Sequence, residues 1–170
     1  MMPASGKEST ELRQQQIVRH LSQQVRDAPE SSRLRLMAAH AEWRIGRKSE
    51  AVRTLKSGIA RDPQSWDLQE VLVDYLVQLR QPQAARDTFD RIPSHVLADG
   101  RWLFLQGRVQ MAAGQWNRAV SSFEQAHGFA QRDQGLQQRS RMCQAICRRE
   151  MGHSSDAVDA YRSMLQSNPA

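Results

Sequence analysis

A small residue recurs along this chain at a fixed spacing. Ala51, Ala85 and Ala119 lie 34 residues apart, and Ala157 follows at a spacing of 38. A period of this size is typical of a helical hairpin that repeats and stacks, because a single hairpin cannot bury its apolar face alone. The spacing therefore predicts an all-α repeat architecture.

Two further positions recur with the alanine. A large apolar side chain comes four residues after it, in turn Leu55, Phe89, Phe123 and Tyr161. Five residues before it stands Gly46, Arg80, Gly114 or Gly152. A small side chain lets two helix axes approach to about 8–10 Å, and the large one fills the space one turn later. Glycine permits the tight turn between the two helices.

These positions divide the chain into one N-terminal helix and four hairpins. We expect a disordered lead over residues 1–7 and a single domain over 8–170. The helix is expected over 9–27, because Leu12, Val18 and Leu21 follow helical spacing. The hairpins are expected over about 32–63, 66–97, 100–130 and 139–169, with a polar insert at 131–138.

The charge and hydropathy restrict the class of protein. The formal net charge is +6, but basic residues are spread over all four repeats instead of forming one dense stripe. This distribution argues against nucleic acid as the partner. Met1–Ser9 holds no apolar stretch typical of a secretory signal, and no run of about 18 apolar residues occurs. We therefore expect a cytoplasmic protein without membrane insertion.

The repeated positions resemble the tetratricopeptide repeat (TPR) family, whose pattern is W-x₂-L-G-x₂-Y…A-x₃-F…P over about 34 residues. The alanine and the following large side chain match in all four copies. The first half of the pattern diverges, and its Trp and Tyr positions hold Arg35 and Glu42, Gln69 and Leu76, Leu103 and Gln110, and Arg141 and Arg148. The resemblance implies a right-handed α-solenoid of about four TPR-like hairpins preceded by an N-terminal helix, with a concave groove lined by the first helix of each hairpin.

The family register also implies which side chains line that groove. They are His40, Trp43, Asp67, Glu70, Asp74, Arg101, Phe104, Arg108, Met111, Met142 and Arg149. In one interpretation Arg101 and Arg108 bind carboxylates of a peptide, while exposed aromatic and methionine side chains hold its apolar groups. In the other, Asp74 and Arg108 neutralise each other and the aromatic side chains are core.

The residues that could carry chemistry do not assemble into a known motif. Cys143 and Cys147 are four residues apart on one helical face, but the spacing supplies no third and fourth metal ligand. We interpret them as packing residues. No nucleophile or phosphate-binding motif surrounds the histidines or glycines. The sequence therefore predicts a protein that is not an enzyme and has neither a metal nor a cofactor.

The predicted function is a non-catalytic module that binds a protein or peptide partner in the groove. Arg101, Phe104 and Arg108 would lie at its centre. Resemblance to small bacterial repeat proteins suggests a secretion chaperone or an adaptor that assembles a larger complex. Two alternatives stay open, namely a helical repeat that binds nucleic acid and an accessory subunit of an enzyme complex.

Overall fold

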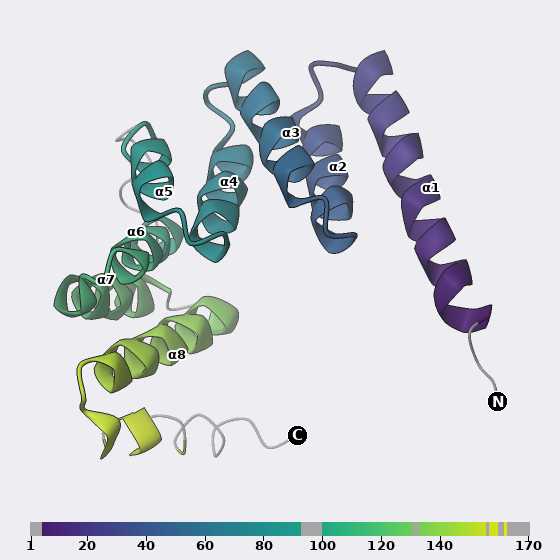
Figure 1. Cartoon of the computed structure of the whole chain (residues 1–170). Helices are drawn as coiled ribbons and strands as arrows, with labels where there is room; N and C mark the ends of the chain where they lie inside the picture. The colour runs from purple at the N-terminus through teal and green to yellow at the C-terminus, as the bar shows by residue number, and fades with distance from the viewer. Residues whose placement is uncertain (1–4, 93–99, 131–132, 156, 160–161, 163–170) are drawn as a thin grey trace. The chain divides into compact units, whose positions relative to one another are not determined.

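The computed structural model describes residues 5–92, 100–130, 133–155, 157–159 and 162, and these contain helices and turns but no strand. The helices are α1 (Ser5–Asp27), α2 (Ser32–Arg44), α3 (Lys48–Arg61), α4 (Trp66–Gln78), α5 (Pro82–Phe89), α6 (Gly100–Ala112), α7 (Trp116–Phe129) and α8 (Gln134–Glu150) (Figure 1). The predicted all-α, TPR-like solenoid class is confirmed.

The chain divides into two compact units, residues 1–75 and 76–170. The N-terminal unit holds α1, the hairpin of α2 and α3, and α4 as far as Tyr75. The C-terminal unit holds α5, the hairpin of α6 and α7, and α8. Each unit therefore contains one complete helical hairpin whose two helices are in extensive contact.

The recurring alanines are buried as their spacing predicts. Ala51, Ala85 and Ala119 are fully buried, and Ala157 is 2% exposed. The large side chains one turn later are buried too, with Leu55 and Phe123 fully enclosed and Phe89 at 7%. Tyr161 and the expected hairpin ends at 97 and 169 lie outside the described residues.

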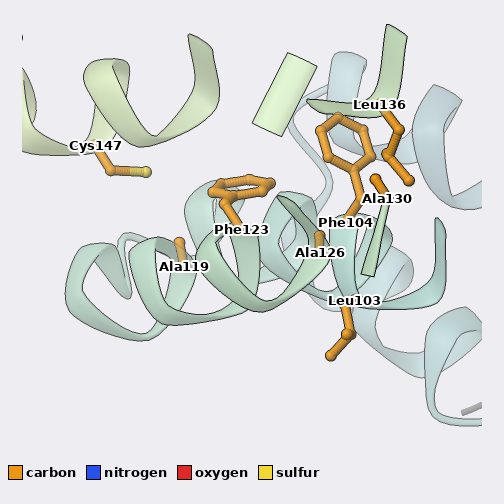
Figure 2. Close-up of a cluster of buried hydrophobic side chains, with 8 residues drawn as sticks. All are labelled: Leu103, Phe104, Ala119, Phe123, Ala126, Ala130, Leu136 and Cys147. Carbon is orange, nitrogen blue, oxygen red and sulfur yellow. The ribbon is translucent and has the colours of Figure 1, made fainter. Parts of the chain in front are cut away.

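The hairpin of α6 and α7 has an aromatic core, which α8 covers. Phe104 of α6 and Phe123 of α7 lie with ring centroids 5.5 Å apart, and Leu136 and Cys147 of α8 are buried in the same cluster (Figure 2). Gly107 makes room for this arrangement, because a Cβ there would lie 2.6 Å from Cε1 of Phe123. The missing side chain lets the aromatic ring lie directly on the backbone of α6.

The turn between the two helices of each repeat needs a left-handed residue. Gly46, Gly114 and Gly152 have φ of 82°, 71° and 88°. At the equivalent place in the second repeat, Arg80 has φ of 55°. This conformation brings the Cβ of an L-residue close to the following carbonyl oxygen, so the turn of the second repeat carries strain that glycine avoids elsewhere.

Two helices begin earlier than the sequence pattern predicts. Ser5, expected in the disordered lead, is the first residue of α1. Gln134 begins α8 within the segment expected to be a polar insert. The Asp133 side chain explains the second difference, since it accepts a hydrogen bond from the backbone N–H of Leu136 at 2.9 Å and caps the helix.

Two polar side chains at the Trp position of the repeat pattern donate hydrogen bonds to a proline carbonyl oxygen in the preceding connector. Arg35 donates to the carbonyl oxygen of Pro29 through Nη2 at 2.8 Å, and Gln69 donates to that of Pro63 through Nε2 at 2.6 Å. In both bonds the acceptor lies six residues before the donor, and Arg35 and Gln69 are 6% and 5% exposed. The equivalent connector carbonyl is therefore satisfied in two successive repeats.

The Tyr position of the pattern also has a recurring hydrogen bond. In the first repeat the Thr54 hydroxyl donates to Glu42 Oε2 at 2.8 Å. In the third repeat, at the same two positions, the Ser122 hydroxyl donates to Gln110 Oε1 at 2.8 Å. A hydroxyl on the second helix thus links both hairpins, once to a carboxylate and once to an amide.

Candidate partner-binding surfaces

An aromatic cluster joins α2 to α4 in the N-terminal unit. The rings of Trp43 and Tyr75 are stacked with centroids 3.8 Å apart and planes 16° apart. The Tyr75 hydroxyl lies 2.7 Å from Nδ1 of His40. The ammonium group of Lys48 lies 5.3 Å from the centre of the Trp43 ring, close enough for a cation–π attraction. Of the two predicted groove residues here, His40 is exposed and Trp43 is half-buried.

Tyr75 holds this cluster together, and the sequence did not single it out. The side chain is 4% exposed. Burial, followed by the nearby carboxylates of Asp74 and Glu42, raises the pKa of the Tyr75 hydroxyl to about 12. The hydroxyl therefore keeps its proton at neutral pH and can donate to His40 Nδ1. In the sequence, the position of Tyr75 directly after the predicted groove residue Asp74 could have indicated its role.

The three predicted carboxylates of the N-terminal unit all lie on α4. Asp67 is exposed, and Glu70 and Asp74 are half-buried. Their spacing of three and four residues places them on one face of the helix. Together with His40 and Trp43 of α2, they form what we call the acidic face of this unit.

Phe104, the predicted apolar anchor of the C-terminal unit, belongs to the core. It is 8% exposed and packs among α6, α7 and α8. The guanidinium carbon of Arg139 lies 5.3 Å from the centre of its ring and covers it further. Phe104 therefore agrees with the interpretation in which the aromatic side chains are core. Arg139, which covers the ring, was not predicted from the sequence.

The remaining predicted residues of this unit lie on α6 and α8. Arg101, Arg108 and Met111 of α6 are half-buried, and Met142 of α8 is 45% exposed. Arg149 donates to Oε1 of Glu150 at 2.7 Å, so part of its charge is neutralised. We call Arg101, Arg108, Arg139 and Met142 the arginine face.

Each face lies within one compact unit of the chain. The family register combines all eleven predicted residues into one groove, and this combination stays a prediction.

The two cysteines are thiols that contribute to packing. Cys147 is fully buried and Cys143 is half-buried. Burial, the neighbouring Cys143 and Glu150 together raise the pKa of the Cys147 thiol to about 11, which keeps it protonated and a poor nucleophile. Within the described ranges, no three His, Cys, Asp or Glu side chains gather closely enough to hold a metal ion.

Comparisons with known proteins agree with an all-α repeat fold. Residues 36–96 match the model of the tetratricopeptide repeat family. Over these residues the chain is similar to tetratricopeptide repeats. The family match covers the first two repeats, and the hairpin of α6 and α7 continues the same pattern beyond it.

Solved structures similar to this chain span nearly its whole length. A structure of MamA from residue 41 to its end, from Desulfovibrio magneticus RS-1, has a TM-score of 0.72 and 13% identity and covers 100% of both chains. A crystal structure of MamA protein has a TM-score of 0.67 and 18% identity, and the match covers 94% of this chain and 85% of that one. At these identities the likeness concerns the fold. No curated protein matches the sequence significantly.

Among the described helices of this repeat protein, none is long and apolar enough to cross a membrane.

Proposed function

We propose that this repeat protein binds protein or peptide partners, through the acidic face of one unit and the arginine face of the other, and acts as a non-catalytic adaptor or chaperone. Tetratricopeptide repeats form protein-interaction modules, and the match of residues 36–96 to this family supports the proposal. The arrangement of charge on α6 carries the proposal. Arg101 and Arg108 are seven residues apart and therefore share one face of the helix, where guanidinium groups can bind carboxylates in a bidentate manner.

The two faces favour partner side chains of opposite charge. Three carboxylates on α4 suit basic side chains of the partner, whereas the arginines of α6 and α8 suit acidic ones. Met142, which is 45% exposed, provides an adaptable apolar contact beside the arginines. An accessory subunit that docks onto a catalytic partner would use these same faces, so the identity of the partner decides between the two roles.

The test replaces Arg101 and Arg108 together with alanine. Partners are first identified by mass spectrometry after photo-crosslinking from position 142 in cells of the source, and binding of the crosslinked segment is then measured as a synthetic peptide. We expect the double substitution to weaken this binding by at least about tenfold, because two charge-assisted contacts are lost, while the helical signal in circular dichroism stays unchanged.

A matched control replaces two exposed arginines of the N-terminal unit, Arg19 and Arg53, which lowers the net charge equally. The control should retain the affinity of the wild-type protein. Equal affinity in the Arg101/Arg108 variant would show that the partner binds elsewhere, and equal loss in both variants would show that net charge alone attracts it.

A further inference from the structure

A small cavity lies between α5, α6 and the start of α7, away from the arginine face. Its volume is about 70 Å³, several times the space that one water molecule needs. Two apolar side chains contribute to its lining, Phe89 of α5 at 7% exposure and Val109 of α6 at 4%. The rest of the lining is polar or charged, which suits a ligand with a short apolar stem and a polar end.

Two glutamines of α6 supply hydrogen-bond donors to this cavity. Gln106 and Gln110 line it, and the oxygens of both amides accept from the Ser122 hydroxyl, at 3.2 and 2.8 Å. Because the oxygen and nitrogen of an amide diverge from one carbon, the two NH₂ groups point away from Ser122. Ser122 itself does not line the cavity. The two amide NH₂ groups are thus available as donors, while Asp90 and Gln115 also line the cavity and carry acceptor oxygens.

The charges of the cavity favour one anionic group. Arg86 and Arg118 line it together with Asp90. Asp90 Oδ2 lies 3.7 Å from Nε of Arg86, so these two charges compensate each other. Within the described part of the chain, no carboxylate pairs with Arg118, which is exposed. The lining thus carries one net positive charge, which matches a single carboxylate.

The cavity is separate from the arginine face, although both use α6. At 100° per residue, Gln106 and Gln110 lie about half a helical turn from Arg101 and Arg108. A substitution on one side therefore leaves the side chains of the other in place.

We propose that this cavity binds the carboxylate of an aspartate or glutamate side chain on a protein partner, as a second contact point outside the groove. Arg118 forms a charge-assisted hydrogen bond to the carboxylate. The amides of Gln106 and Gln110 donate to its other oxygen, and the methylene groups of the acidic side chain pack on Phe89 and Val109. A cationic side chain is disfavoured, because the net charge of the lining is positive.

The experiment follows the side-chain amide signals of Gln106 and Gln110 by ¹H–¹⁵N NMR while a peptide of glutamates is added to the full-length protein. The probe is a deca-glutamate peptide, with a deca-glutamine peptide as the neutral control. We expect saturable shifts of both signals with the glutamate peptide only. Arg118→Gln should weaken this binding by about tenfold, the usual effect of losing one charge-assisted contact.

Two comparisons make the outcome decisive. Arg44→Gln removes the same charge from an exposed position of α2 and should leave the binding within about twofold. An oligothymidylate at equal charge should not shift the amide signals. Unmoved signals, equal weakening by both substitutions, or displacement by the oligothymidylate would each overturn the proposal. The Arg101/Arg108 variant should retain the shifts, so failure of the groove proposal is distinguishable from failure of this one.

Discussion

The hairpins of α2 with α3 and of α6 with α7 place different side chains at equivalent positions. In the N-terminal unit Ala39 of α2 corresponds to Gly107 of α6, and Leu55 of α3 corresponds to Phe123 of α7. All four positions are buried. Where the first helix loses a methyl group, the second gains an aromatic ring. The comparison teaches that, at these two positions, the repeat preserves the space between its helices more strictly than the identity of the residues.

The polar links between the helices differ in the same compensating way. Thr54 with Glu42 in one hairpin corresponds to Ser122 with Gln110 in the other, and both bonds measure 2.8 Å. Only the first link contains an ionisable group. Burial raises the pKa of the Glu42 carboxyl, against the smaller opposing effect of the Thr54 hydrogen bond. The N-terminal hairpin should therefore depend on pH through this link, and the C-terminal one should not.

The largest expected effect comes from breaking the match between Gly107 and Phe123. The Cβ of Gly107→Ala would meet three ring atoms of Phe123 at 2.6 to 2.9 Å, and this ring is fully buried. We expect a loss of about 1–3 kcal/mol in the free energy of unfolding, measured by urea denaturation. Adding Phe123→Leu recreates the pair of the N-terminal hairpin and should recover part of that loss.

The control for this prediction is Gly128→Ala, in the same unit. Among the described residues, a Cβ at this position would lie within 4 Å of no atom beyond the adjoining backbone of its own helix. Alanine should therefore be neutral or stabilising by about 0.5–1 kcal/mol. Strictly additive effects of Gly107→Ala and Phe123→Leu would contradict the proposed compensation between the two positions.

The turn of the second repeat offers a stabilising substitution. Arg80→Gly replaces a residue with φ of 55° by the one found at equivalent turns. Relief of this strain, less the greater freedom of glycine in the unfolded chain, should stabilise the protein by about 0.5–1 kcal/mol. Thermal unfolding measures the change as a higher Tm.

The reverse exchange in the N-terminal unit sharpens the test. Gly46 has φ of 82°, and a Cβ there would meet none of the described residues within 4 Å. Gly46→Arg should therefore lower Tm through the backbone alone. If Arg80→Gly left Tm unchanged, the strain assigned to the second turn would be absent.

The smallest expected effect comes from changing the hydroxyl–carboxylate hydrogen bond of the N-terminal hairpin into the hydroxyl–amide hydrogen bond found in the C-terminal hairpin. Glu42→Gln keeps an oxygen for the Thr54 hydroxyl and removes the buried charge. We expect it to raise the free energy of unfolding at pH 7 by a few tenths to about 1 kcal/mol. Because the folded pKa of Glu42 lies above its ordinary value of 4.5, wild-type stability declines as pH rises from 4.5 through the folded pKa. The difference in the free energy of unfolding between the variant and the wild type should thus vanish below pH 4.5.

The comparison uses urea denaturation of both proteins across the acid range, with Glu11→Gln on an exposed position of α1 as the control. The control should show no such pH-dependent difference. A constant difference between Glu42→Gln and the wild type at every pH would mean that the carboxyl of Glu42 does not titrate differently in the folded state.

The fold could be predicted from the sequence because close helix packing demands small residues at regular places. Ala51, Ala85 and Ala119 recur at such places and are fully buried. The start of α8 was harder to predict, since it depends on one cap by Asp133 within a polar stretch. The faces were predictable only as helix positions. Whether Phe104 is exposed depends on α8, whose Arg139 covers the ring from a distant part of the sequence.

The sequence by itself determined the repeat, the buried alanines, the turns and the row of carboxylates on α4, because each follows from spacing within one hairpin. Only the tertiary structure decided which polar departures from the family pattern are internal. Arg35 and Gln69 are hydrogen-bonded to connector carbonyls, and Gln106 and Gln110 line a cavity against α5 and α7. The sequence pattern does not distinguish a polar side chain that is hydrogen-bonded to water from one that is hydrogen-bonded to a neighbouring helix. The packing of helices that are distant in sequence decides between the two.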